Sequence, residues 1–130
     1  MSRSKALAAG RVAYAAGFRD QTLVLAIAIA GAESAWEPSR IGDEHLVNVK
    51  WGPSLGLWQI RSLKPKYLHL EPVRDGRKLL DPQFNADAAY QISSGGVNWT
   101  PWSAYTNNTY ADFIDEATTV VQILNSEGLL

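Results

Sequence analysis

An apolar segment near the N-terminus constrains the fold of this chain most strongly. Positions 23–32 read Leu-Val-Leu-Ala-Ile-Ala-Ile-Ala-Gly-Ala and carry no charge. A membrane-spanning helix needs about 20 such residues, so the segment is too short to cross a bilayer. Because its apolar residues leave no polar face, we expect a helix over about 21–34 that is buried on all sides. Asp20 is the expected N-cap of this helix.

Glu33 follows this apolar run directly. If the segment is a buried helix, the carboxyl lies on its last turn. Desolvation and the negative end of the helix dipole would then both raise the pKa of Glu33. A glutamate with a raised pKa serves as a general acid near neutral pH. The other interpretation is that Glu33 marks the point where the helix reaches solvent, and its position alone does not decide between the two.

The composition indicates one globular domain over residues 1–130. The chain is 46% hydrophobic and 19% charged, which suffices for a core without metal or disulfide support. Its 12 basic and 13 acidic side chains leave it nearly neutral, so we expect no nucleic-acid partner. The lack of cysteine excludes disulfides, thiolate zinc sites and cysteine nucleophiles. We expect no metal and no cofactor.

Three further helices are expected around the apolar one. The alanine-rich segment 4–16 ends before a glycine, which favours a helix stop. Asp81 and Pro82 provide an N-cap and a first helical residue for a helix that ends by 95–96. A last helix carries apolar residues on one face between 113 and 124. The fold class predicted from these patterns is mainly α.

Two other segments lack a long periodic pattern. Prolines and glycines interrupt residues 36–66, where we expect a structured loop layer, although 57–60 is compatible with a short helix or strand. Residues 99–110 are rich in turns and aromatic side chains. No alternating pattern indicates a regular sheet.

Four short motifs occur in one order along the chain. They are Ala32-Glu33-Ser34, Ser54-Leu55-Gly56-Leu57-Trp58-Gln59-Ile60, Asp81-Pro82-Gln83-Phe84-Asn85 continuing to Ala88-Ala89-Tyr90, and Trp102-Ser103-Ala104-Tyr105. Together they resemble the lysozyme-like domain of the soluble lytic transglycosylase and goose-type lysozyme superfamily. The resemblance covers residues 20–110 approximately. Within this superfamily, the chain is similar to the domains found in lysins and tail proteins of phages that infect actinobacteria.

This resemblance implies a lysozyme-like fold of the transglycosylase type, in which a loop-rich layer beside a central buried helix lines a cleft. It also implies cleavage of the bond between N-acetylmuramic acid and β-1,4-linked N-acetylglucosamine in peptidoglycan, with Glu33 as the general acid. Many transglycosylases continue the last motif with Asn-Ala-Gly. This chain has Thr106-Asn107-Asn108 there, so no role is assigned to those three positions.

A second carboxylate would decide the product. Asp43 lies where goose-type relatives carry an acid, and it would activate water in an inverting hydrolase. The other interpretation is an exposed turn residue beside Glu44. If no second carboxylate takes part, the 6-hydroxyl of the sugar attacks and gives the 1,6-anhydro product that the resemblance to transglycosylases implies. The sequence does not choose between these outcomes.

Substrate binding requires flat apolar surfaces and hydrogen-bonding groups, because sugar rings present C–H faces rimmed by hydroxyls. The resemblance implies that the Gln59 motif lines the cleft and that the Tyr105 hydroxyl lies near Glu33. The candidate substrate-binding residues are Ser54, Trp58, Gln59, Tyr90, Trp102 and Tyr105. A structural hydrogen bond is the alternative for Gln59. A structural role is at least an equal interpretation for Tyr90 and Asn85, and core packing is an interpretation for each tryptophan.

The sequence also contains features of three other kinds of protein. Gly52-Pro53-Ser54-Leu55-Gly56 matches the nucleophile elbow of serine hydrolases, but the order of later aspartates and histidines does not fit that class. A zinc site built from residues 43–45 and His69 would indicate a peptidase, but the spacing matches no two-histidine helix motif. A lysozyme-like module without catalysis, which only binds peptidoglycan or shapes a phage tail, is the remaining alternative.

Peptidoglycan glycan strands are the expected partner, and we expect a monomer that does not insert into a membrane. The N-terminus resembles a signal peptide only faintly, because Arg11 and Arg19 interrupt it before a long apolar region develops. We therefore predict a phage-encoded, antimicrobial enzyme that reaches the cell wall as an endolysin after holin release or as part of a virion.

Overall fold

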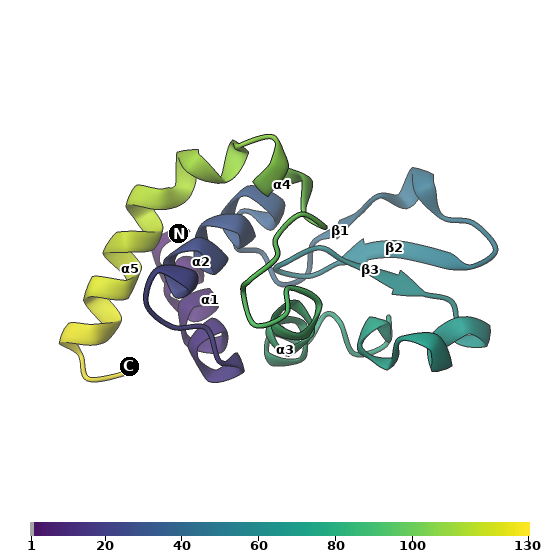
Figure 1. Ribbon diagram of the computed structural model, residues 1–130, viewed down its shortest axis with the longest axis horizontal. Coiled ribbons are helices and arrows are strands. Elements are labelled where there is room, and N and C mark those ends of the chain that lie inside the picture. The colour runs from purple at the N-terminus through teal and green to yellow at the C-terminus, as the bar shows by residue number, and fades with distance from the viewer. Residues whose placement is uncertain (1) are drawn as a thin grey trace.

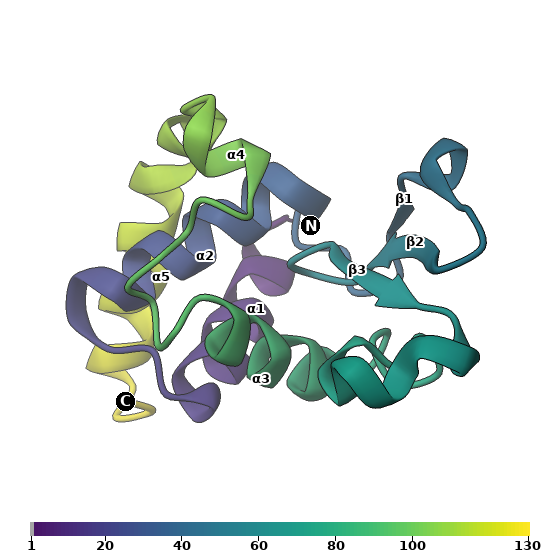
Figure 2. The same cartoon turned by 45° about the vertical axis from the view of Figure 1, so that its right-hand side comes forward.

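The computed structural model describes residues 2–130. Its helices gather on one side of the molecule and a small sheet lies at the other end, as both Figure 1 and Figure 2 show. The main elements in chain order are α1 (Ser2–Ala16), α2 (Asp20–Ser34), β1 (Ile41–Gly42), β2 (Trp51–Leu55), β3 (Ile60–Leu63), α3 (Pro82–Ile92), α4 (Ser103–Thr106) and α5 (Ile114–Ser126). The predicted mainly α fold class is confirmed.

The apolar segment forms the central helix α2, as its composition predicted. Helices α1, α4 and α5 all pack against it. Residues from Ala26 to Gly31 are fully or almost fully buried, which accounts for the lack of a polar face. The prediction that Asp20 is the N-cap was wrong, because Arg19 occupies the N-cap position and no side chain caps the helix. No helix within residues 2–130 is long and apolar enough to span a membrane.

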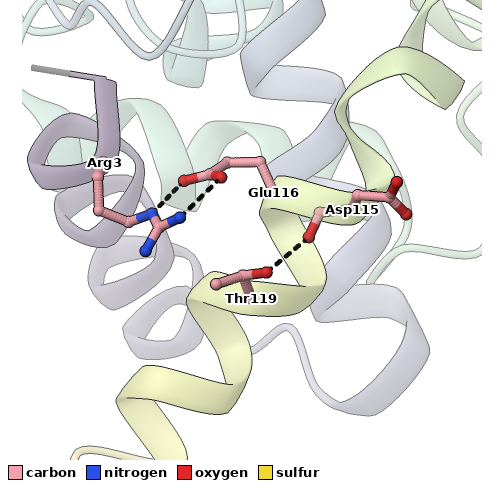
Figure 3. Close-up of polar contacts among 4 residues, drawn as sticks. All are labelled: Arg3, Asp115, Glu116 and Thr119. Atoms are coloured by element: carbon pink, nitrogen blue, oxygen red, sulfur yellow. Dashed lines mark hydrogen bonds and ion pairs between the residues drawn. The ribbon is translucent and has the colours of Figure 1, made fainter.

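Small residues let α1 approach α5 closely. Ala6, Ala9 and Ala13 of α1 are buried, and a Cβ at Gly10 would lie 2.8 Å from the Leu124 side chain. Arg3 at the start of α1 forms an ion pair with Glu116 of α5, shown in Figure 3. The two ends of the chain therefore pack side by side around α2.

The predicted loop layer proved to contain a three-stranded antiparallel sheet in the order β1-β2-β3. The strands are short, and the pairing of β2 with β3 is irregular between Trp51 and Ser54. That irregularity accommodates Pro53, whose backbone has no N–H to donate to a neighbouring strand. A sequence pattern broken by proline and glycine hid these strands, because strand pairing rather than alternation stabilises them.

Helix α3 supports the turn between β2 and β3. Asp81 caps it by accepting a hydrogen bond from the N–H of Phe84 at 2.9 Å, as predicted, and the helix ends at Ile92, a few residues before the expected glycines. Asn85 is fully buried and donates to the carbonyls of Leu55 and Leu79, each at 2.8 Å. Its carbonyl accepts the N–H of Trp58 at 2.9 Å. Asn85 therefore fixes the turn that carries the second motif.

Candidate functional site

A cleft of about 380 Å³ lies between the helical side and the sheet. Its walls come from the end of α2, the loop after β1, the strands β2 and β3, and the segment that enters α4. The residues that line it are Glu33, Asp43, Trp51, Ser54, Gln59, Ile60, Arg61, Arg74, Ile92, Pro101, Trp102 and Ser103. The cleft therefore brings together the first, second and fourth sequence motifs.

Glu33 is partly buried on the last turn of α2. Burial is the largest influence on its carboxyl and raises its pKa above the ordinary value of 4.5. The N–H of Ala104 at 3.4 Å from Oε2 opposes this rise in pKa, and repulsion from Asp43 adds to it. The carboxyl therefore keeps its proton to a higher pH than a solvent-exposed glutamate does.

The backbone reverses directly after Glu33 and fixes its position. Ala35 and Trp36 both adopt left-handed conformations, with φ values of 53° and 60°. The Trp36 ring folds back over α2, where its Nε1 donates to the Ile27 carbonyl at 2.9 Å. A Cβ at Gly31 would lie 2.6 Å from this ring, so the turn requires glycine there. Glu33 is thus held at the cleft by a packed turn.

Asp43 lies in the loop after β1 and lines the same cleft as Glu33. Its backbone is left-handed, with a φ of 56°, and its Oδ2 accepts a hydrogen bond from the Ser54 hydroxyl at 2.5 Å. The pairing of β1 with β2 positions this contact, because Gly42 lies opposite Ser54. The two candidate catalytic carboxyls therefore share one cleft, and Ser54 orients the second of them.

Gln59 lines the cleft, but its amide group is already engaged in the protein. Nε2 donates to the carbonyls of Gly56 at 3.0 Å and Arg40 at 3.1 Å. Its Oε1 fills the space beside Gly42, where a Cβ would lie only 2.3 Å away. Both amide hydrogens thus join two loops of the cleft wall, which is the structural role that the sequence left open.

The two tryptophans predicted to bind substrate occupy different places. Trp102 lines the cleft, and its Nε1 donates to the Trp58 carbonyl at 2.8 Å. The Trp58 side chain is 0% exposed and donates to the Ala26 carbonyl at 2.9 Å. The prediction that Trp58 contacts substrate was therefore wrong, because its ring has no free face on which a sugar could stack.

The two predicted tyrosines also lie outside the cleft lining. Tyr90 packs edge-on against Phe18 with ring centroids 5.1 Å apart, and its ring covers Gly17. This packing supports the structural role of Tyr90, and substrate contact by it stays a prediction from the sequence. Tyr105 follows Ala104 in α4, and its ring stacks on Tyr110 at a centroid distance of 5.4 Å.

The sequence model of a family described as a lysozyme-like domain matches residues 10–104. This stretch includes Glu33, Asp43 and every residue that lines the cleft. The chain belongs to the lysozyme-like domain family. Membership indicates a glycosidase that acts on peptidoglycan in the bacterial cell wall. No curated protein and no solved structure matches the chain.

The geometry of this lysozyme-like domain does not fit the rival sites. Ser54 lies within strand β2 and donates its hydroxyl to Asp43, whereas a nucleophile elbow requires a turn between a strand and a helix. Within residues 2–130, no three side chains of histidine, aspartate or glutamate gather as a metal site would require. Neither a serine hydrolase nor a zinc peptidase is supported by these positions.

Sequence reasoning missed several residues of the lysozyme-like cleft. Trp51, Arg61 and Arg74 form the part of its wall that the sheet side supplies. The signal for Arg61 was its place directly after the second motif, and the register of β2 and β3 sets it opposite Ser54. No sequence signal indicated Arg74, because only the tertiary fold brings it to the cleft.

Proposed function

We propose that this chain cleaves the β-1,4 bond between N-acetylmuramic acid and N-acetylglucosamine, with Glu33 as the general acid. The single observation that carries the proposal is the partly buried Glu33 in a cleft of a lysozyme-like domain, with its pKa raised by burial. Breaking a glycosidic bond requires a proton on the leaving oxygen, and a carboxylic acid that stays protonated supplies it. We further propose that residues 1–130 act as one catalytic domain and as a monomer, without a cofactor.

In the first half of the reaction, Glu33 transfers its proton to the bridging oxygen. The bond from the anomeric carbon of the muramyl sugar to that oxygen breaks, the N-acetylglucosamine leaves with a free 4-hydroxyl, and Glu33 becomes a carboxylate. Positive charge develops at the anomeric carbon as this bond breaks. The nearby Asp43 carboxylate stabilises this charge through space.

The second half adds a nucleophile to the anomeric carbon. In hydrolysis, Asp43 removes a proton from water as the hydroxyl adds, and solvent exchange returns one proton from Asp43 to Glu33. The orientation of Asp43 by Ser54 supports this route. In transglycosylation, the 6-hydroxyl of the same sugar adds and its proton returns to the Glu33 carboxylate. The two products differ by one water molecule.

Replacement of Glu33 by glutamine tests the proposal. We expect a fall in glycan cleavage of about a hundredfold or more, because the amide keeps the shape but cannot donate a proton in this way. Lysis of purified cell walls and mass spectrometry of the released muropeptides measure both the rate and the product. Glu37→Gln is the matched control, because Glu37 lies outside the cleft and pairs with Lys5. Undiminished lysis by Glu33→Gln would contradict the assignment.

Three of the predicted substrate-binding residues remain part of the proposal. Trp102 lines the cleft with the small part of it that is exposed, about 5%, and Gln59 joins the loops around the cleft. We also retain Tyr105 as a residue near the acid, on the ground that its neighbour Ala104 donates to Glu33. A phage origin, with release through a holin or within a virion, stays a prediction from the sequence.

A further inference from the structure

A group of two arginines and one tryptophan forms the cleft wall on the sheet side. Arg61, Arg74 and Trp51 all line the cleft. The guanidinium carbons of Arg61 and Arg74 lie 5.7 Å and 5.4 Å from the centre of the Trp51 ring. This distance is within the range of cation–π attraction, so the ring holds both positive charges close together.

The charge of Arg61 is fixed in place but not neutralised. Its Nε donates to the Gly52 carbonyl at 2.5 Å, and its Nη2 donates to the Leu46 carbonyl. These partners are uncharged, and within residues 2–130 no carboxylate forms an ion pair with Arg61. Arg61 therefore brings to the cleft a positive charge that is not part of an ion pair among the described residues.

Arg74 adds a second charge that is only partly compensated. Its side chain is 16% exposed, and Nη1 donates to the Arg61 carbonyl at 3.0 Å. Its Nε lies 2.9 Å from Oε1 of Glu71, but this buried nitrogen makes no aligned hydrogen bond to a described residue. The Glu71 side chain is 43% exposed, so solvent weakens its hold on Arg74.

Charge is therefore divided across the cleft. Glu33 and Asp43 form an acidic part, whereas Arg61 and Arg74 form a basic part. A ligand that carries a carboxylate is repelled by Asp43 and attracted by the two arginines, and guanidinium groups are well suited to bind carboxylates. An uncharged glycan gains nothing from this division of charge.

We propose that Arg61 and Arg74 form a subsite for a carboxylate carried by the glycan strand. The inference rests on the proposed function, and it names what the enzyme selects: peptidoglycan strands with free carboxylates, over uncharged polymers of N-acetylglucosamine such as chitin. The carboxylate comes either from the lactyl group of a muramyl sugar without its peptide or from the peptide itself. In both cases the arginines orient the strand relative to Glu33.

Binding to matched glycans tests the subsite. The Glu33→Gln protein is titrated by calorimetry with peptide-free glycan strands, in which the lactyl carboxylates are free, and with peptide-bearing strands, in which only the peptide carries carboxylates. Each strand is also prepared with its carboxylates blocked as amides, and a chitooligosaccharide is the uncharged reference. The same titrations are repeated with Glu33→Gln proteins that carry a further substitution. These are Arg61→Met, Arg74→Met, both of these changes together, and Lys66→Met.

We expect the free-carboxylate form of at least one strand to bind about tenfold more tightly than its blocked form, the size of one charge-assisted hydrogen bond. The double arginine variant should reduce this ratio to near one. Lys66 is an exposed cation outside the cleft, so Lys66→Met should leave the ratio unchanged. A preference in the peptide-free strand identifies the lactyl group, and a preference confined to the peptide-bearing strand identifies the peptide.

Equal binding of free and blocked forms in both strands would overturn the subsite. So would a ratio that survives in the double variant. Arg61→Lys separates the effect of charge from the effect of the hydrogen bonds, because it keeps the cation but loses the pair of bonds to the Gly52 and Leu46 carbonyls. Circular dichroism checks that each variant is folded. Cleavage by the unaltered enzyme is measured separately, so failure of the proposed function appears as absent turnover and failure of the subsite appears as absent selectivity.

Discussion

The carboxyl of Glu33 lies where the apolar helix α2 meets the cleft, and its surroundings set its acidity. Burial raises the pKa of Glu33, whereas the pKa of Glu37, four residues later and with a side chain that is 35% exposed, is lowered. Hydrogen bonds from Lys5 and Ser39 lower the pKa of Glu37 to about 2. The two glutamates thus acquire opposite pKa shifts, because Glu33 is partly buried at the cleft and Glu37 accepts hydrogen bonds from Lys5 and Ser39.

These opposite shifts predict opposite effects on stability. The folded pKa of Glu33 is raised, so the native state keeps a proton that the unfolded chain loses above 4.5, and stability falls as pH rises through this window. Glu33→Gln should therefore be more stable than the unaltered protein at neutral pH, and this gain should disappear below about pH 4.5. Urea unfolding at several pH values measures it.

The contrasting variant is Glu37→Gln. Because the folded pKa of Glu37 is lowered, its contribution is present above 4.5 and is lost as pH falls toward about 2. The variant should be slightly less stable at neutral pH, with a difference that fades in acid. A gain in stability for Glu37→Gln at neutral pH would contradict the inference that the contact between Glu37 and Lys5 stabilises the fold.

Replacement of Asp43 by alanine is the second prediction for single residues. If its carboxylate activates water, cleavage should fall by about a hundredfold, as expected for a general base. Ser54→Ala removes only the hydrogen bond that orients Asp43 and should cost less. Muropeptide mass spectrometry gives the rate and the product together. A fall of only severalfold with anhydro products would indicate attack by the sugar hydroxyl instead.

At the scale of elements, the helices were predictable and the sheet was not. The buried α2 and the Asp81 cap of α3 follow from local patterns that a sequence displays. The strands β1 to β3 depend on pairing between separate segments, and Gly52 and Pro53 interrupt the pattern of β2. Strands of this kind become visible only when the tertiary structure brings their partners together.

Asn85 of α3 forms hydrogen bonds with the turn between β2 and β3, so its removal should strongly lower the stability of the fold. Asn85→Ala leaves two buried carbonyls and one buried N–H without partners, so we expect a loss of about 3 kcal/mol or more in the free energy of unfolding. Urea denaturation measures this loss. Asn98→Ala is the matched control, because Asn98 is exposed and caps only a local turn. A similar loss in both variants would contradict a specific role for Asn85.

Across the whole molecule, the two ends of the chain hold the helical side together. Helix α1 packs against α5, and Arg3 reaches Glu116 across this contact, as Figure 3 shows. Both side chains are substantially open to solvent, with 47% and 28% exposure. Exposed ion pairs of this kind contribute little, so apolar contacts such as those around Gly10 must supply most of the stability of this interface.

This ranking predicts a small, salt-sensitive effect for the ion pair. Arg3→Met, Glu116→Gln and the double variant should each lower the Tm slightly in dilute buffer, with a coupling that disappears near about 1 M salt, where screening acts over roughly 3 Å. Gly10→Val should lower the Tm far more, because its side chain would meet Leu124 and Val120. Thermal unfolding followed by circular dichroism measures both. A coupling that persists in salt would contradict the ranking.

The difference between local patterns and tertiary contacts also explains how much of the candidate site could be predicted from the sequence. Glu33, Ser54, Gln59 and Trp102 lie in short motifs, and the structure places all four in one cleft. Trp58 and Tyr90 belong to the same motifs but pack inward, since a motif does not specify which way each side chain points. Arg74 reaches the cleft from a segment without any motif, so only the fold reveals it.

Trp51 and Trp102 line the cleft from its two sides, one from the sheet and one from the entry to α4. Trp51 is half-buried and Trp102 is only 5% exposed, whereas Trp36, Trp58 and Trp99 are buried outside the cleft lining. Indole fluorescence responds to what touches the ring. The enzyme thus carries an intrinsic optical reporter of occupancy, with the three rings outside the cleft lining as a background. Single phenylalanine replacements at 51 and 102 would divide the signal between the two walls and follow a polysaccharide as it enters, without any attached dye.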